Sequence, residues 1–332
     1  MAPILRRLVL LVLLAAIAAA GFVFYSIGAP YAGFENETFV DVPHGASTRG
    51  IAAILEESGV VRSRWVFLAA RLLEPGSKLK AGEYRFAAPA SALEVYRKIA
   101  KGDIFYYELR VPEGSNQFDI AASLEQLGLM TAADFLKVAA NPALIRDLAP
   151  QAPGLEGYLF PATYRVTRHT NAQQIAKDMT DRFRRAWKEL GAPAGGVHRT
   201  VTLASLVEKE TAIAGDRSAV ASVFENRLTK RMSLDCDPTT VYAALLEDRY
   251  RGTIYRSDLN STNAYNTYKH VGLPPGPIAN PGLASLKAVV APASTDYLYF
   301  VAKPDGGGGH NFSATLERHN AAVKAYRNGL KR

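Results

Sequence analysis

The N-terminus carries the feature that most limits how this chain can fold. The stretch from Leu8 to Ile27 is twenty residues long and almost wholly apolar, and the first acidic residue is Glu35. A helix of that length spans about 30 Å, the thickness of a bilayer core. Arg6 and Arg7 precede it, and basic residues mark the cytoplasmic side of membrane helices. The sequence therefore predicts a single-pass anchor in the cytoplasmic (inner) membrane, with the rest of the chain on its periplasmic, extracytoplasmic side.

A cleaved signal peptide is the alternative for the same stretch. Ala18, Ala19 and Ala20 provide the small residues that a cleavage site needs. The apolar run is long for a signal peptide, so the sequence favours a retained anchor. Both interpretations export the rest of the chain.

The composition removes several function classes. A formal net charge of +8 suits an anionic partner, but the chain lacks a motif that reads DNA or RNA, so no nucleic-acid partner is expected. Cys236 is the single cysteine, which excludes an internal disulfide and a cysteine-based zinc site. The sequence also lacks H-E-x-x-H, G-x-S-x-G, Walker and dinucleotide-binding motifs.

Two stretches of the chain resemble each other. Residues 42–59 read V-P-H-G-A-S-T-R-G-I-A-A-I-L-E-E-S-G, and residues 111–128 read V-P-E-G-S-N-Q-F-D-I-A-A-S-L-E-Q-L-G. Each predicts a strand, an amphipathic helix and a glycine stop. In the first copy, a second helix follows at 63–73 and an aromatic strand at 82–86. In the second copy, a second helix follows at 132–138 and aromatic strand residues at 158–161 and 164–166. This β-α-α-β repeat resembles the LysM carbohydrate-binding module; a generic spacer without a ligand is the alternative.

One carboxylate lies where a predicted helix should be apolar. At about 100° per residue, Glu210 falls within a stripe of apolar residues: Leu203, Leu206, Val207, Ile213 and Ala214. Burial disfavours the charged form and raises the pKa, which a general acid requires near neutral pH. Glu208 falls on the opposite side and is expected to be solvated. The alternative for Glu210 is a buried ion pair, for instance with Arg217 or Arg227.

Longer motifs run through the chain in order: L-E-G-Y-L-F-P-A-T-Y (155–164), L-A-S-L-V-E-K-E-T (203–211), V-F-E-N-R-L (223–228), L-D-C-D-P-T-T-V-Y (234–242), A-Y-N-T-Y (264–268), G-L-P-P-G-P-I-A-N-P-G (272–282), Y-L-Y-F-V-A (297–302) and G-H-N-F-S (309–313). With the first repeat they cover residues 42 to 326. In this order they resemble the endolytic murein transglycosylase family, also called YceG-like. The resemblance implies that the second Glu of E-K-E-T is the catalytic acid. That residue is Glu210, which the helical face selected independently.

The resemblance also implies a reaction. Glu210 would protonate the glycosidic oxygen between N-acetylmuramic acid and N-acetylglucosamine in nascent peptidoglycan. The muramoyl 6-hydroxyl would then close on the anomeric carbon, leave a 1,6-anhydro end and terminate strand elongation. No metal and no cofactor is implied. The expected partners are glycan strands, the membrane and cell-wall synthases.

The matching motifs supply candidates for holding the sugar: Asn226, Asp237, Tyr265, Asn266 and Tyr268. Asn in a turn and Tyr in a core are the alternatives. Asp235 and Asp237 are candidates for a second carboxylate, although Asp237 precedes a proline and has the pattern of a helix N-cap. Cys236 departs from the family pattern and is interpreted as a tolerated small residue.

The expected fold class is α+β, in four parts: an N-terminus and anchor at 1–30, a LysM-like module at 36–104, a second β-α-α-β unit at 105–195 that packs on the catalytic domain, and a mostly helical catalytic domain with a small β element at 196–332. Two rival functions stay open. One is a non-catalytic peptidoglycan-binding protein, and the other is a conventional hydrolase that uses Glu210 and Asp237 with water.

Overall fold

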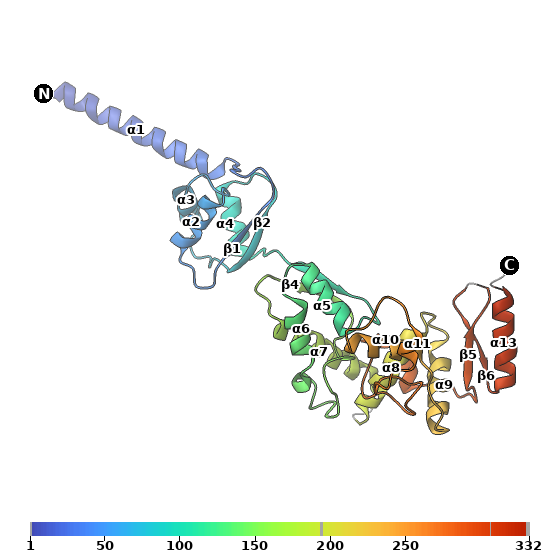
Figure 1. The fold of residues 1–332 in the computed structure, drawn as a ribbon. Helices are drawn as coiled ribbons and strands as arrows, with labels where there is room; N and C mark the ends of the chain where they lie inside the picture. The colour runs from blue at the N-terminus through green and yellow to red at the C-terminus, as the bar shows by residue number, and fades with distance from the viewer. Residues whose placement is uncertain (1, 193–194, 306, 330–332) are drawn as a thin grey trace. The chain divides into compact units, whose positions relative to one another are not determined.

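A computed structural model describes residues 2–192, 195–305 and 307–329, and the chain forms two compact units (Figure 1). The first unit is Met1–Tyr107 and the second is Glu108–Arg332. The boundary predicted between residues 195 and 196 falls inside the second unit. The α+β class is confirmed, since helices and three two-stranded sheets are both present.

The first unit begins with the long apolar helix. Its elements are α1 (Ala2–Gly28), β1 (Thr38–Val42), α2 (Thr48–Glu57), α3 (Arg64–Leu73), β2 (Gly82–Phe86) and α4 (Ala92–Lys101). β1 and β2 pair antiparallel, with Val42 opposite Gly82. The β-α-α-β order predicted for the first copy is confirmed, and α4 extends it.

Helix α1 meets the requirements of a membrane span from Leu5 to Gly28, where mean hydropathy is 2.7. Its side chains are exposed from Leu5 to Tyr25, Ser26 is half-buried, and Ile27 is buried in the core of the first unit. That core is centred on Phe67, Tyr84 and Tyr96, whose side chains are fully buried.

The second unit opens with the other repeat, β3 (Tyr107–Val111), α5 (Gln117–Gln126), α6 (Ala132–Ala139) and β4 (Ala162–Val166), in which β3 pairs with β4. The strand predicted over residues 158–161 was wrong, because these residues form the end of a turn, a bend and irregular chain. The backbone N–H of Leu159 donates to the side chain of Asn280 at 2.9 Å and is therefore not available to a strand neighbour.

The rest of the second unit is mostly helical. After the short helix η1 (Pro142–Leu144), it contains α7 (Ala172–Leu190), α8 (Val197–Glu210), α9 (Arg217–Thr229), α10 (Asp237–Leu246), α11 (Arg256–Leu259), α12 (Leu283–Val290), β5 (Tyr299–Ala302), β6 (His310–Ser313) and α13 (Leu316–Gly329). The sequence pattern also predicts a helix over residues 172–190, and α7 confirms it. Strand β6 was missed; it pairs antiparallel with β5, and Val301 is opposite Asn311.

Asn280 joins the second repeat to the helical region. Its amide nitrogen donates to the carbonyl of Ser115 and to the carboxylate of Glu156, both at 2.9 Å. The backbone N–H of Gly114 also donates to the carbonyl of Asn280. Residues from three distant motifs therefore meet at one buried amide.

Candidate active site

Helix α8 places the candidate acid at its last position. Residues 201–207 of this helix are all buried, and α8 packs against α9, α10 and α12. Thr211 then adopts an extended conformation with φ −144°, so the helix ends at Glu210. Ile213 and Ala214 were expected to continue the apolar stripe, but they lie beyond this end. The unpaired backbone carbonyls at the C-terminal end of a helix form its negative pole. A charged carboxylate is therefore disfavoured at this position.

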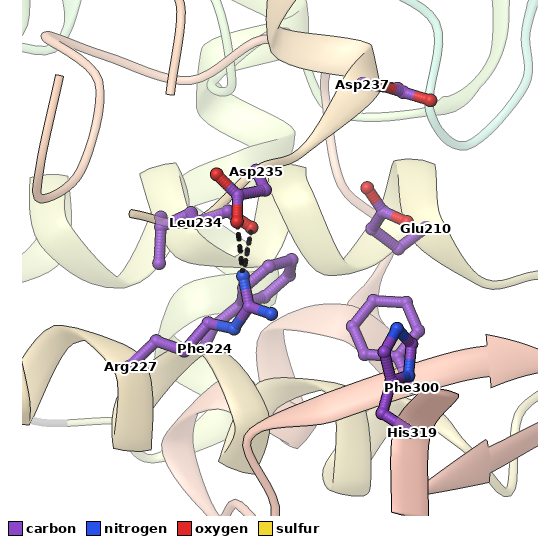
Figure 2. A pocket seen from close by; sticks show the side chains of 8 residues that line it. All are labelled: Glu210, Phe224, Arg227, Leu234, Asp235, Asp237, Phe300 and His319. Atoms are coloured by element: carbon purple, nitrogen blue, oxygen red, sulfur yellow. Dashed lines mark hydrogen bonds and ion pairs between the residues drawn. The ribbon is translucent and has the colours of Figure 1, made fainter. Parts of the chain in front are cut away.

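The side chain of Glu210 lines a pocket of about 270 Å³. The other lining residues are Phe224, Arg227, Leu234, Asp235, Asp237, Phe300 and His319. Figure 2 shows Glu210 between Asp237 on one side and Phe300 with His319 on the other. The pocket thus combines carboxylates, a guanidinium, an imidazole and aromatic rings, which suits a polar ligand with apolar faces such as a sugar.

Burial raises the pKa of Glu210, and the charge of Asp237 raises it further. A hydrogen bond with the Cys236 thiol and the charges of His310 and Arg227 act in the opposite direction. Burial dominates, and the described residues include no salt-bridge partner within 4 Å of Glu210. The arrangement favours a protonated carboxyl that faces the pocket.

The expectation that Glu208 is solvated was wrong. Its side chain is only 6% exposed, and its Oε1 lies 3.5 Å from Nη2 of Arg217, which is 11% exposed. Its Oε2 accepts a hydrogen bond of 2.9 Å from the backbone N–H of Gly282. The buried ion pair that was the alternative for Glu210 therefore involves Glu208, and the two glutamates have different environments two residues apart.

Asp237 lines the pocket, and Tyr268 contacts this aspartate. The Tyr268 hydroxyl donates to Oδ1 of Asp237 at 2.6 Å. Asp237 is the first residue of α10, and the N-cap is Cys236, so the N-cap role predicted for Asp237 was wrong. Asp237 also lines a second pocket of about 290 Å³, together with Asn116, Lys209, Pro238, Val241, Tyr242, Leu245, Tyr250, Ile254 and Ile278.

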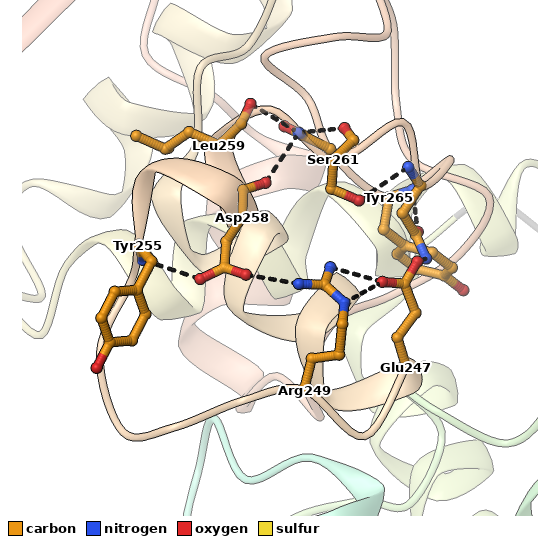
Figure 3. Close-up of polar contacts among 9 residues, drawn as sticks. Glu247, Arg249, Tyr255, Asp258, Leu259, Ser261 and Tyr265 are labelled. Carbon is orange, nitrogen blue, oxygen red and sulfur yellow. Dashed lines mark hydrogen bonds and ion pairs between the residues drawn. The ribbon is translucent and has the colours of Figure 1, made fainter.

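The structure does not bring the two predicted asparagines to the pocket lining. The amide nitrogen of Asn226 donates to the carbonyls of Thr295 and Tyr297, each at 2.9 Å. Asn266 is fully buried, and its amide nitrogen donates to backbone carbonyls between residues 258 and 261 (Figure 3). Both side chains hold loops in place.

The loop around Asn266 is held by charge as well. Arg249 contacts the carboxylates of Glu247 and Asp258, the latter at 2.7 Å (Figure 3). Tyr265, the remaining predicted contact, packs its ring against Tyr242 with centroids 5.1 Å apart. It lines a third pocket, of about 450 Å³, which Tyr242 also lines. Tyr265 is therefore away from Glu210 but next to a side chain of the second pocket.

Several pocket residues were not among the predicted site residues. Arg227 contacts Asp235 at 3.1 Å and also donates to the carbonyl of Leu298 at 2.7 Å. His319 stacks on Tyr299, with ring centroids 5.2 Å apart, and its buried Nδ1 has no hydrogen-bond partner among the described residues. Burial and the charge of Arg227 lower the pKa of His319, which keeps the imidazole neutral. No periodic pattern in the sequence marks His319, which helix α13 contributes from near the end of the chain.

Cys236 is buried and free, and its thiol faces Glu210. Burial raises the pKa of Cys236 well above its ordinary value, and the charge of Glu210 adds to this effect. A thiol held in its neutral form is a poor nucleophile. Among the described residues, no group of three or more His, Cys, Asp or Glu side chains is arranged to hold a metal ion.

Comparisons with known proteins agree with the motif pattern. A model of the YceG-like family matches residues 40–325. An endolytic murein transglycosylase of Bacillus subtilis is 34% identical over 307 residues, which cover 86% of this chain and 84% of that protein. One of Streptococcus pneumoniae is 30% identical over 335 residues, which cover 88% of this chain and 60% of that protein.

A solved structure is similar as well. The crystal structure of a YceG-like protein from Listeria monocytogenes is 32% identical in sequence, with a TM-score of 0.55. The match covers 87% of this chain and 99% of that one. The family model and the relatives each span most of the chain, and the chain therefore belongs to the YceG-like family.

Proposed function

We propose that this protein is an endolytic lytic transglycosylase that cleaves nascent peptidoglycan strands and leaves 1,6-anhydro-N-acetylmuramic acid ends. The observation that carries the proposal is Glu210, a carboxyl whose pKa is raised by burial and which faces a pocket, with no salt-bridge partner in the described part of the chain. The names of the relatives from B. subtilis and S. pneumoniae support the same reaction.

Glu210 serves first as an acid and then as a base. Its proton passes to the glycosidic oxygen, and the bond from that oxygen to the anomeric carbon of N-acetylmuramic acid breaks. The 6-hydroxyl oxygen of the same sugar forms the new bond to the anomeric carbon. Its proton returns to the Glu210 carboxylate, and N-acetylglucosamine leaves with a free 4-hydroxyl. One carboxyl is sufficient because the substrate provides the nucleophile.

The surrounding residues suit the acid step. Arg227 pairs with Asp235, which neutralises one of the two nearby carboxylates. The negative charge of Asp237 raises the pKa of Glu210 and so helps to hold the proton on it. A hydrogen bond from Tyr268 fixes the Asp237 carboxylate at the pocket edge. We assign Asp237 and Tyr268 to substrate binding on this basis.

The Nδ1 of His319 is a further candidate contact. It is buried, unpartnered among the described residues and part of the pocket lining. An unpartnered buried nitrogen carries a desolvation cost that a sugar hydroxyl would remove. A bound glycan would then extend past Asp237 into the second pocket, where Tyr242 and Tyr250 offer aromatic faces. Tyr265 would act there by supporting Tyr242, and Asn226 and Asn266 by holding loops.

We further propose that α1 is a retained anchor with Arg6 and Arg7 in the cytoplasm, and that the first unit assists glycan binding as a LysM-like module. The length and hydropathy of α1 support the anchor. The β-α-α-β order of the first unit supports the module. Cell-wall synthases are the expected protein partners, because the membrane is where strands are polymerised.

The products decide between the proposed reaction and its rivals. Purified protein is incubated with glycan strands, and the products are analysed by mass spectrometry. Anhydro ends at internal positions are expected. Reducing ends would instead identify a hydrolase that uses Glu210 and Asp237 with water. Binding without cleavage, under conditions where the protein is folded, would identify a wall-binding protein.

A further inference from the structure

Helix α3 is apolar on two opposite faces. Phe67 and Ala70 on one face are fully buried in the core of the first unit. Trp65 and Leu72 on the other face are 72% and 80% exposed, and Leu73 beside them is 51% exposed. A helix that is apolar all round is normally covered on all sides. Within the first unit, nothing described covers this outer face.

The exposed face belongs to a helix that packs against α1. Helix α1 contacts α3 and α4, and α3 lies beside the end of α1 (Figure 1). Ile27, at that end, belongs to the same core as Phe67. Leu68 and Ala69 of α3 pack against this core. The apolar surface of α3 is therefore continuous with the helix that is long enough to span a membrane.

The length of α1 sets the depth of this contact. The span Leu5–Gly28 has 24 residues, about 36 Å of helix against a hydrocarbon core of about 30 Å. The last turn of α1 would therefore emerge among the lipid headgroups. Tyr25, 70% exposed, lies in that turn, and Trp and Tyr favour this depth.

The charge around α3 also favours a lipid surface. Residues 62–80 contain five basic residues, Arg62, Arg64, Arg71, Lys78 and Lys80, and one acidic residue, Glu74. Basic residues beside an apolar helix face are attracted to anionic headgroups. A glycan strand would instead need hydrogen-bonding groups beside the aromatic ring, and Leu72 and Leu73 provide none.

We propose that the outer face of α3, defined by Trp65, Leu72 and Leu73, lies in the headgroup layer of the membrane that α1 spans. Trp65 and the leucines enter the boundary of the acyl chains, and the basic residues contact anionic lipid. The inference rests on the anchored enzyme proposed above. It adds a second attachment, which fixes how the first unit is oriented on the membrane.

The experiment uses the two tryptophans of the chain, Trp65 and Trp187. Trp187 is 6% exposed and belongs to the second unit. The full chain is reconstituted in vesicles of equal parts phosphatidylcholine and phosphatidylglycerol, with and without brominated acyl chains, which quench nearby indoles. Trp187→Phe leaves Trp65 as the reporter, and Trp65→Phe leaves Trp187. The Trp65 emission is expected to shift to shorter wavelength and to lose most of its intensity with brominated lipid, while the Trp187 emission stays unchanged.

Substitutions test whether the face itself makes the contact. In the Trp187→Phe chain, Leu72→Glu places a charge on the exposed face and should restore most of the Trp65 emission while the protein still floats with the vesicles. Arg49→Glu, at an exposed position of α2, changes the charge by more and should leave the quenching intact.

Three outcomes would overturn the inference. If the protein floats with the vesicles but Trp65 is not quenched, the anchor holds and the α3 contact fails. If the protein stays in the soluble fraction, the anchor fails and the contact fails with it. If the Trp65 emission responds to glycan strands or to protein concentration but not to brominated lipid, a sugar or a second copy covers the face instead.

Discussion

The turn after the first strand is built in the same way in the two repeats. Gly45 has φ +77° and Gly114 has φ +76°. Each turn leads to a helix whose N-cap side chain accepts a backbone hydrogen bond. Ser47 accepts from the backbone N–H of Gly50 in the first copy, and Asn116 accepts from those of Phe118 and Asp119 in the second. The short-range sequence pattern is therefore enough to specify this local structure twice.

The surroundings of the two turns differ. A side chain added at Gly45 would meet nothing within 4 Å, whereas one added at Gly114 would meet Glu208 and Lys209 at the end of helix α8. The carbonyl of Gly114 also accepts a hydrogen bond from Nζ of Lys209 at 3.2 Å. The same motif is thus a free turn in one unit and a support for the candidate acid in the other. Function depends on what a repeat contacts.

If the chemistry belongs to the second unit, the largest effect should come from Glu210→Gln. The variant keeps the shape of the side chain but removes the transferable proton. Activity should fall by about 10²- to 10⁴-fold, with stability preserved, because Gln resembles the neutral acid that burial favours. The rate of anhydro-end formation and a urea melt measure the two quantities. Retained activity would remove Glu210 from the reaction.

Glu208→Gln tests the buried ion pair between helices α8 and α9, next to the candidate acid. It leaves the nearly buried Arg217 without its partner, so the free energy of unfolding should fall by about 3 kcal/mol. Glu225→Gln is the matched control, because Glu225 pairs with Arg199 at the surface and should cost less than about 1 kcal/mol. If the two variants lose the same free energy of unfolding in urea, the Glu208–Arg217 pair stabilises the fold no more than a surface pair does.

The pH profile sharpens the assignment of the acid. The proposed reaction needs protonated Glu210, and burial raises the pKa of this carboxyl. Activity should therefore persist above the ordinary range for Glu and fall as the pH rises through the raised pKa. Cys236→Ala removes a hydrogen bond that lowers the pKa of Glu210, so the descending limb should move to higher pH. The rates are measured on purified glycan strands. If the descending limb of Cys236→Ala lies at the same pH as that of the unmodified protein, this account is contradicted.

The smallest effects should come from the two turn glycines. Gly45→Ala and Gly114→Ala force a side chain into a left-handed conformation, and each should cost about 1 kcal/mol. A longer side chain separates the two positions. Gly114→Leu should cost more than Gly45→Leu and should lower activity by displacing Glu208 or Lys209. Equal losses for the leucine pair would mean that the second turn does not support the helix.

Local patterns predicted the elements well. Helix α7 was predicted over its whole length, and both repeats have the predicted order, because periodicity, caps and glycine stops depend on neighbouring residues. Strand β6 was missed because four residues after a glycine turn carry too little pattern. Residues 158–161 were misread because the backbone N–H of Leu159 donates to Asn280, more than a hundred positions away.

The candidate site was predictable only in part. The helical face selected Glu210, although Ile213 and Ala214 of the supposed stripe lie beyond the end of the helix. Glu208 was misjudged because its partners are Arg217 on α9 and the backbone of Gly282. Such long-range partners decide whether a polar side chain is solvated, and one sequence does not display them.

The buried thiol beside Glu210 gives the protein a built-in reporter. Cys236 is the one cysteine in the chain and is 1% exposed. A small thiol reagent that modifies the folded protein must therefore do so through transient opening next to the acid, with no background from other sites. The labelling rate would measure how often this part of the molecule opens. Slower labelling in the presence of glycan strands would report occupancy without any need for turnover.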